Sequence, residues 1–185
     1  SFVDSNFTNN ENTTSNGGGA IHLSNSSPSF TRCVFTGNVT KANSYAGAIL
    51  MNSSSSAFTD CVFASNRSDV NSAGAIYIDA SSSPTFSGNE FRNNYALQFG
   101  GAVFVANPGM HFVGGAFIGN SAEFGGAVYA THSSGPTFSN SRLVGNEANA
   151  SASAKGGFAY FQDTVTSSIF VNCDISGNKA NDRSG

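Results

Sequence analysis

Two short motifs alternate along the whole chain, and their spacing restricts the fold more than any other feature. The first, Phe-x-x-x-x-Φ-x-x-Asn with Φ a large apolar residue, occurs seven times, at Phe2/Phe7/Asn10, Phe30/Phe35/Asn38, Phe58/Phe63/Asn66, Phe86/Phe91/Asn94, Phe112/Phe117/Asn120, Phe138/Leu143/Asn146 and Phe170/Ile175/Asn178. The second, a Gly-Gly motif, lies between successive copies, at Gly18–Ile21, Ala46–Ile49, Ala73–Ile76, Gly100–Val103, Gly125–Val128 and Gly156–Ala159. Such a period, about 25 to 31 residues, predicts a solenoid in which each repeat forms one turn.

Composition supports a packed repeat fold and excludes some functions. Only 10% of the residues are charged, but 17 are phenylalanine, and this excludes a disordered chain. Twelve of these phenylalanines occupy the two apolar positions of the Phe…Asn motif, so we expect them in the core. The net charge is −3 and the eight basic residues are scattered, which disfavours nucleic-acid binding.

The repeats predict a right-handed parallel β-helix of about six to seven coils, an all-β fold. Each Gly-Gly motif leads into a short strand rich in β-branched and aromatic residues, and the Phe…Asn motif forms further strands. Successive coils pair in parallel, about 4.8 Å apart, so that equivalent side chains stack. We expect the seven motif asparagines to form a ladder; the alternative is that they only favour turns. They are Asn10, Asn38, Asn66, Asn94, Asn120, Asn146 and Asn178.

We expect residues 1–185 to form one β-helix segment, part of a longer repeat protein or a subunit whose ends are covered by neighbours. The chain begins within one Phe…Asn motif and ends where another Gly-Gly motif would follow. Neither end shows the polar capping segment that solenoids use. No signal peptide is visible, and no apolar run approaches the roughly 20 residues that cross a membrane.

The paired motifs resemble the repeats of the chlamydial polymorphic membrane proteins. The tetrapeptides Phe35–Asn38, Phe63–Asn66, Phe91–Asn94 and Phe117–Asn120, together with the Gly-Gly-Ala-Ile segments, carry this resemblance over essentially the whole chain. It implies a repetitive β-helix in a surface-exposed passenger that mediates adhesion. The chain departs from the pattern at Leu143 and Ile175, where the phenylalanine is lost, and at Phe158 within the sixth Gly-Gly motif.

The charged residues do not predict a catalytic or metal site. Asp4, Arg32 and Asp60 are equivalent positions of consecutive repeats, and we expect a surface ladder of ion pairs in preference to a pair of catalytic carboxylates. The remaining acidic residues that we considered fall in different columns or distant coils: Asp79, Glu90, Asp163 and Asp174. His22, His111 and His132 also lack the spacing of metal ligands. We therefore predict no catalytic residue, metal or cofactor.

Cys33, Cys61 and Cys173 share one inward column. Cys33 and Cys61 belong to adjacent coils, so a disulfide between them and inert packing of two free thiols both remain open. Cys173 has no cysteine within reach.

A stripe of mostly aromatic residues is the main candidate contact surface. It occupies the outward position of the strand after each Gly-Gly motif, at His22, Leu50, Tyr77, Phe104, Tyr129 and Tyr160. Exposed rings suit sugars or a partner protein. The alternative is that a long bend covers the stripe, or that the rings cover one another.

Five Asn-x-Ser/Thr sequons are expected on outward or bend positions and are candidates for N-glycosylation: Asn6, Asn12, Asn25, Asn52 and Asn149. Those at Asn38 and Asn66 belong to the expected ladder and should be buried and unmodified.

These observations favour a non-enzymatic, extracellular structural or adhesive segment of a cell-surface or secreted fibre. Its expected partners are further copies, end to end or laterally, or a host surface or glycan. One alternative is a carbohydrate-binding module that uses the aromatic stripe. A second is a non-catalytic portion of a polysaccharide-degrading β-helix enzyme.

Overall fold

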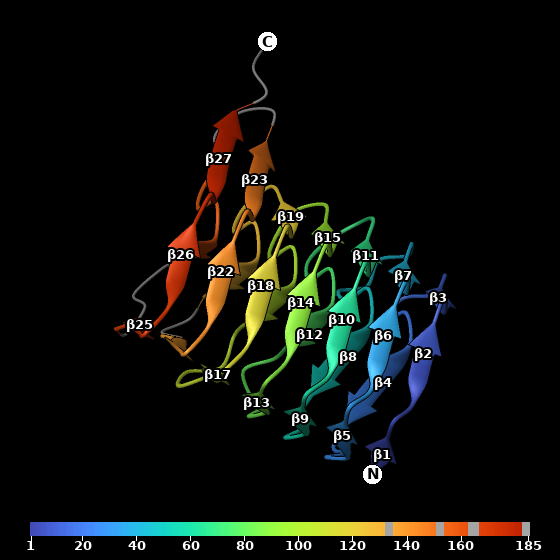
Figure 1. The fold of residues 1–185 in the computed structure, drawn as a ribbon. Coiled ribbons are helices and arrows are strands. Elements are labelled where there is room, and N and C mark those ends of the chain that lie inside the picture. Colours follow the sequence, from blue (N-terminus) through green and yellow to red (C-terminus); the bar gives the residue numbers. More distant parts are fainter. Residues whose placement is uncertain (132–134, 151–153, 163–166, 183–185) are drawn as a thin grey trace.

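The computed structural model describes residues 1–131, 135–150, 154–162 and 167–182, and these residues form a parallel β-helix (Figure 1). The chain winds through four sheets in turn, so that neighbouring strands of each sheet come from successive coils. Three sheets have seven strands and one has six, so the helix comprises six complete coils and three strands of a seventh. Helices are absent from these residues, and the sheets pair only in parallel, so the predicted fold class is confirmed.

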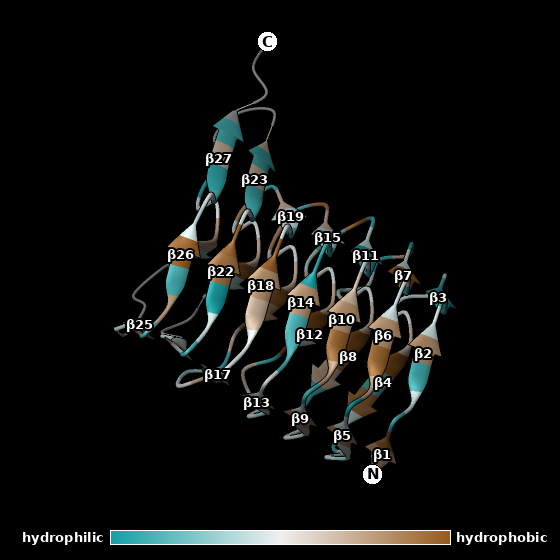
Figure 2. Cartoon of the chain, viewed as in Figure 1, coloured by the Kyte–Doolittle hydropathy of each residue, from teal (hydrophilic) through white to brown (hydrophobic). Residues whose placement is uncertain are grey.

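The first two sheets carry the Phe…Asn motif. The first contains β1 (Phe2–Val3), β5 (Ser29–Thr31), β9 (Ala57–Thr59), β13 (Thr85–Ser87), β17 (His111–Val113), β21 (Thr137–Ser139) and β25 (Ile169–Val171). The second contains β2 (Asn6–Thr8), β6 (Val34–Thr36), β10 (Val62–Ala64), β14 (Glu90–Arg92), β18 (Ala116–Ile118), β22 (Arg142–Val144) and β26 (Asp174–Ser176). In Figure 2 strands such as β22 and β26 change from hydrophilic to hydrophobic along their length.

The third and fourth sheets complete each coil. The third contains β3 (Glu11–Asn12), β7 (Val39–Thr40), β11 (Arg67–Ser68), β15 (Tyr95–Ala96), β19 (Ser121–Ala122), β23 (Glu147–Ala150) and β27 (Lys179–Asp182). The fourth, which follows the Gly-Gly motif, contains β4 (Ile21–Ser24), β8 (Ile49–Asn52), β12 (Ile76–Ile78), β16 (Val103–Val105), β20 (Val128–Ala130) and β24 (Ala159–Phe161). No helix long and apolar enough to cross a membrane occurs among the described residues.

Two columns of phenylalanine rings form the core between the first two sheets. Phe30 and Phe58 are paired in register and stack with centroids 5.0 Å apart, and Phe35 and Phe63 stack at 4.8 Å. Within one coil the columns meet edge to face, as Phe30 and Phe35 do at 5.6 Å. Burial of one such ring stabilises the fold by about 1.5–3 kcal/mol, so the columns account for a large part of the stability of a chain with few charges.

The glycine at the second position of each Gly-Gly motif allows two coils to approach closely. A Cβ placed on Gly74 would lie 2.0 Å from the carbonyl oxygen of Gly101, and one on Gly47 would lie 2.0 Å from that of Gly74. Neither glycine has a positive φ, so the requirement is for space and not for an unusual backbone conformation. The motif is therefore a packing motif, which explains its regular recurrence.

At Phe158 the core accommodates a residue that departs from the repeat. It occupies a column that holds alanine in the other five coils, and its ring packs edge-on against Phe138 at 5.3 Å and Phe117 at 5.9 Å. Its coil is also the one in which Leu143 replaces the second phenylalanine of the motif. The extra ring thus compensates, within the same coil, for the ring that Leu143 lacks.

Candidate functional site

The predicted stripe exists as a continuous column on the outside of the fourth sheet. Strand register pairs His22 with Leu50, Leu50 with Tyr77, and so on to Tyr160. Tyr77 and Phe104 stack with centroids 4.6 Å apart and an interplanar angle of 11°, and Phe104 and Tyr129 stack at 5.1 Å and 20°. The side chains therefore point away from the core but contact one another along the axis.

Three further rings, which the sequence analysis missed, widen the stripe. They belong to the residue just before a Gly-Gly motif, namely Tyr45, Phe99 and Phe124. Phe99 packs against Tyr129 at 4.7 Å and against Phe124 at 5.6 Å. This position is fixed relative to the motif, so alignment of the repeats on the glycines would have revealed it. We call the combined set the aromatic surface: Tyr45, Tyr77, Phe99, Phe104, Phe124, Tyr129 and Tyr160.

Two members of the predicted stripe are not exposed, and this corrects the expectation. Leu50 is 2% exposed, in a small outer cluster with Ala46 and Ala73, and Tyr129 is 5% exposed beneath the neighbouring rings. Tyr77, Phe104 and Tyr160 are half-buried, and only His22 is exposed. Much of the area of the rings is used in contacts between them. The surface consequently presents ring edges and hydroxyl groups more than open ring faces.

The motif asparagines form the expected ladder. The Oδ1 of Asn94 accepts hydrogen bonds from the backbone N–H and the Nδ2 of Asn66, both at 3.0 Å. The Nδ2 of Asn94 donates onward to Asn120 Oδ1 and back to the carbonyl oxygen of Phe63, both at 2.9 Å. The same pattern recurs along the column, whose members between Asn38 and Asn146 are buried, whereas Asn10 is exposed and Asn178 half-buried. The asparagines therefore satisfy buried backbone groups between coils as well as forming turns.

Two smaller polar ladders were not predicted. The backbone N–H of Ser54 donates to the Oγ of Ser82 at 2.9 Å, and that of Ser26 donates to Ser54 Oγ at 3.2 Å. In the cysteine column Asn89 is buried, its Oδ1 accepts from the Cys61 N–H, and its Nδ2 donates to the Phe58 carbonyl, both at 2.9 Å. Polar side chains thus join neighbouring coils at three different bends.

The surface charges form isolated ion pairs. Arg32 donates from Nε and Nη2 to the two carboxylate oxygens of Asp4, at 2.8 and 2.9 Å, and this bidentate bond holds the pKa of Asp4 below its usual value. None of the described ion pairs joins Arg32 to Asp60, so only half of the expected ladder closes. Other pairs join Lys41 to Glu11 and Arg92 to Glu90, at 2.9 Å each. These groups are exposed, so the pairs contribute little to stability.

The described residues do not bring candidate catalytic groups together. Five of the described carboxylates each contact a basic side chain of their own or an adjacent coil at 4.0 Å or less: Asp4, Glu11, Asp69, Glu90 and Asp174. No cluster of three or more histidine, cysteine, aspartate or glutamate side chains suited to a metal occurs in the part of the chain that the structure describes. His132 and Asp163 lie outside the described residues.

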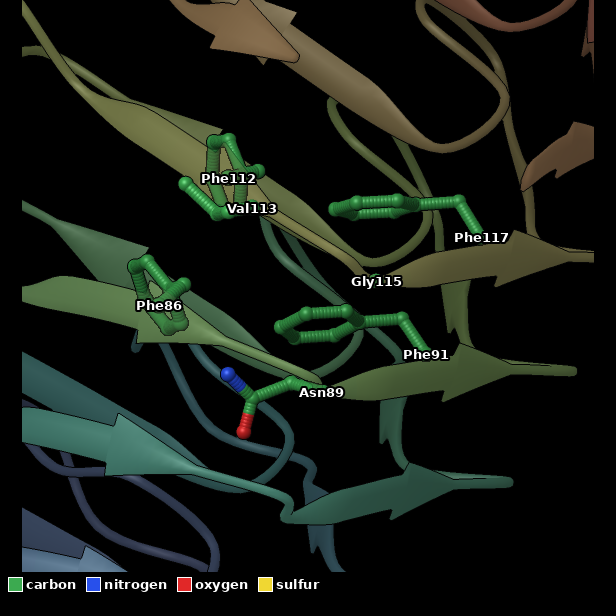
Figure 3. A pocket seen from close by; sticks show the side chains of 7 residues that line it. All are labelled: Phe86, Asn89, Phe91, Phe112, Val113, Gly115 and Phe117. Carbon is green, nitrogen blue, oxygen red and sulfur yellow. The ribbon is translucent and has the colours of Figure 1, made fainter. Parts of the chain in front are cut away.

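One gap in the interior is a packing feature of the core. Figure 3 shows it between two successive coils, with Phe112 above Phe86 and Phe117 above Phe91. Gly115 leaves the gap because it supplies no side chain to the column that holds Asn89 and Cys61 one and two coils earlier. The space is too small to hold water, so it is not a ligand site.

The cysteines are free thiols, and the inert-packing alternative holds for Cys33 and Cys61. Both are fully buried, and the Cys61 Sγ donates to the carbonyl oxygens of Thr59 and Phe30 at 3.4 and 3.5 Å. Burial raises the pKa of the Cys61 thiol to about 11. Cys173 is partly exposed in the last coil.

Cys61 is expected to resist alkylation by iodoacetamide in the native protein near pH 8, because the reactive thiolate is scarce at a pKa of about 11 and the sulfur is buried. Peptide mass spectrometry before and after unfolding in denaturant would measure this. Cys173 serves as the internal control and should be modified first. Equal rates at Cys61 and Cys173 in the folded chain would contradict the packing that we describe.

The sequons differ in accessibility. Asn6 and Asn25 are exposed, and Asn52 and Asn149 are half-buried. Asn12, expected on an outward or bend position, is instead 9% exposed, and its Oδ1 accepts from the N–H and Oγ1 of Thr14 at 2.8 and 2.9 Å. It lies in the column that holds Thr40 and Ser68 in the next coils, which face the interior. Asn12 is therefore a poor glycan acceptor in the folded chain.

Comparison with known proteins identifies the architecture. A family model described as "Right handed beta helix region" matches residues 2–163, most of the chain. No curated protein and no solved structure shows a significant match.

Proposed function

The chain belongs to the family of right-handed β-helix regions, and from this premise we propose that it is a non-enzymatic structural and adhesive segment of an extracellular or cell-surface fibre. One observation supports this most: the asparagine ladder runs without interruption through all seven motifs. Each coil is bonded to the next through its backbone, its asparagines and its phenylalanine rings. Such a segment resists bending, as a fibre requires.

The distribution of charge supports a non-enzymatic role. A polysaccharide lyase or hydrolase needs carboxylates or basic groups that converge on one groove. Here Asp4, Glu11 and Glu90 each contact their own basic partner, and their side chains are exposed. Fold alone would be compatible with an enzyme, so this proposal depends on the residues and not on the family.

The adhesive part of the proposal rests on the resemblance to the chlamydial polymorphic membrane proteins and on the aromatic surface. Half-buried rings arranged over several coils, with few charges among them, suit contact with a partner protein. We propose that partners are further copies of the chain or a host surface. Exposed sequons at Asn6 and Asn25 are the best candidates for glycans if the source cell glycosylates its secreted proteins.

A carbohydrate-binding module has less support. Sugars bind to the faces of aromatic rings, but Tyr77, Phe104 and Tyr129 stack face to face and cover one another. A glycan array separates the two roles: binding that is lost in Tyr77→Ala with Tyr129→Ala would favour the module. Cleavage of any polysaccharide by the native chain would favour the enzyme.

An antibody against the chain is expected to label intact, unpermeabilised cells of the source organism, because the proposed segment lies outside the cell. Beads coated with the native chain should also be retained on a cell monolayer, and beads coated with a misfolded Gly74→Ala chain should not. Labelling only after permeabilisation, or equal retention of both kinds of bead, would refute the proposal.

A further inference from the structure

Four of the five tyrosines lie in two pairs, each joining adjacent coils. Tyr45 and Tyr77 have ring centroids 4.9 Å apart and an interplanar angle of 37°, and Tyr129 and Tyr160 have centroids 5.6 Å apart and an angle of 62°. The fifth, Tyr95, lies beneath the guanidinium of Arg67 at 4.9 Å and has no ring partner among the described residues. The proposed role as a structural segment of a fibre does not explain why tyrosines are paired in this way.

We propose that Tyr45 and Tyr77 form a site of oxidative modification, at which a one-electron oxidant joins the two rings into an intramolecular dityrosine. The product is thus a covalent bond between the second and third coils. The oxidant that the proposal requires is hydrogen peroxide acting through a haem peroxidase. Nothing in the assignment to the β-helix family implies this reaction.

The geometry favours this pair for coupling. The two rings lie side by side, with centroids 4.9 Å apart and planes tilted by 37°. Tyr45 lies in the bend between β7 and β8 and is 37% exposed, so an oxidant can reach it and its ring can adjust. Tyr77 lies in β12, half-buried between Tyr45 and Phe104, and so remains in place as the acceptor of the new bond.

The second pair is less suited to the reaction. Tyr129 is 5% exposed, and its hydroxyl donates to the side chain of Gln162. Its ring centroid lies 5.6 Å from that of Tyr160 at an interplanar angle of 62°, so these two rings are farther apart and more nearly perpendicular than those of Tyr45 and Tyr77. The aromatic surface therefore contains a favourable pair and an unfavourable one, and the two can be compared directly.

The chemistry balances as follows. Each phenol loses one electron and one proton, and the two phenoxyl radicals form one carbon–carbon bond between the ring positions next to the oxygens. The hydrogens on those two carbons move to the phenol oxygens and restore both aromatic rings. The net loss is two hydrogen atoms, which reduce one hydrogen peroxide to two waters.

The protonation state of Tyr77 is consistent with loss of a proton together with the electron. Burial raises the pKa of the Tyr77 phenol, and the nearby Tyr45 and Asp79 raise it further. The group is consequently protonated at neutral pH.

The test oxidises the dilute chain with hydrogen peroxide and a haem peroxidase and isolates the monomer. The expected result is the blue fluorescence of dityrosine in the monomer and a pair of peptides, one containing Tyr45 and one Tyr77, joined with the loss of two hydrogens. Tyr45→Phe and Tyr77→Phe should each abolish this product, whereas Tyr95→Phe should leave it unchanged. Phenylalanine keeps the ring, so all three variants should melt like the parent before oxidation.

A cross-linked monomer should melt at a higher temperature than the untreated chain, because the new bond restricts the unfolded state. Dityrosine found only in covalent dimers, or only between Tyr129 and Tyr160, would overturn the proposal, as would a product that persists in Tyr45→Phe. Cell labelling and bead retention involve no oxidant, so their results are independent of this one.

Discussion

Replacement of Gly74 by alanine is expected to prevent stable folding, with a loss in the free energy of unfolding of about 4 kcal/mol or more. The added Cβ would lie 2.0 Å from the carbonyl oxygen of Gly101 and 2.7 Å from the backbone nitrogen and oxygen of Tyr95. All three are backbone atoms, and the two of Tyr95 belong to β15, so no side-chain rotation can relieve the clash. Two coils would have to separate, and the hydrogen bonds around them would break.

Gly109 supplies the matched control. It has a φ of +77°, and an added Cβ would have nothing within 4 Å. Gly109→Ala therefore introduces backbone strain without a clash, and we expect the free energy of unfolding to fall by about 1–2 kcal/mol. Urea unfolding followed by circular dichroism would compare the stability of the two variants. If Gly74→Ala shows no cooperative transition at all, it does not fold, which also agrees with the expectation. Equal stability of the two variants would show that the coils are not as closely packed as described.

Asn94→Ala is expected to lower the free energy of unfolding by about 3–5 kcal/mol, since each buried polar group left without a partner costs about 1–3 kcal/mol. The substitution removes the acceptor of the Asn66 backbone N–H and the donor to the Phe63 carbonyl oxygen. It also removes the side-chain bond to Asn120. All of these groups are buried between coils, where water cannot replace the lost side chain.

Asn10→Ala is the control for the ladder, because Asn10 has the same motif position but is exposed in the first coil. Among the described residues its side chain donates to Asn38 Oδ1 alone, at 2.8 Å, and we expect a loss below about 1 kcal/mol. Thermal unfolding of both variants, measured in the same buffer, would give the difference. If Asn94→Ala had the same melting temperature as the parent chain, the asparagines would be no more than turn formers.

The corrections to the aromatic stripe have a common physical origin. The sequence placed Leu50 and Tyr129 on an outward face, and the strand register agrees. Their burial depends on side chains from outside the strands: Ala46 and Ala73 pack beside Leu50, and Phe99 packs against Tyr129. Alternation along a strand predicts which side of the sheet a residue faces, but not what covers that side.

The sequence by itself determined the parallel β-helix, its coil number, the asparagine ladder and the phenylalanine core, because repeats in register force equivalent residues to stack. Only the tertiary structure decided where stacked side chains are covered and which of them meet across bends. Asn12 is buried, the cysteines are unbridged, and Tyr45 lies against Tyr77. These features depend on the course of bends of unequal length, which no periodic pattern specifies.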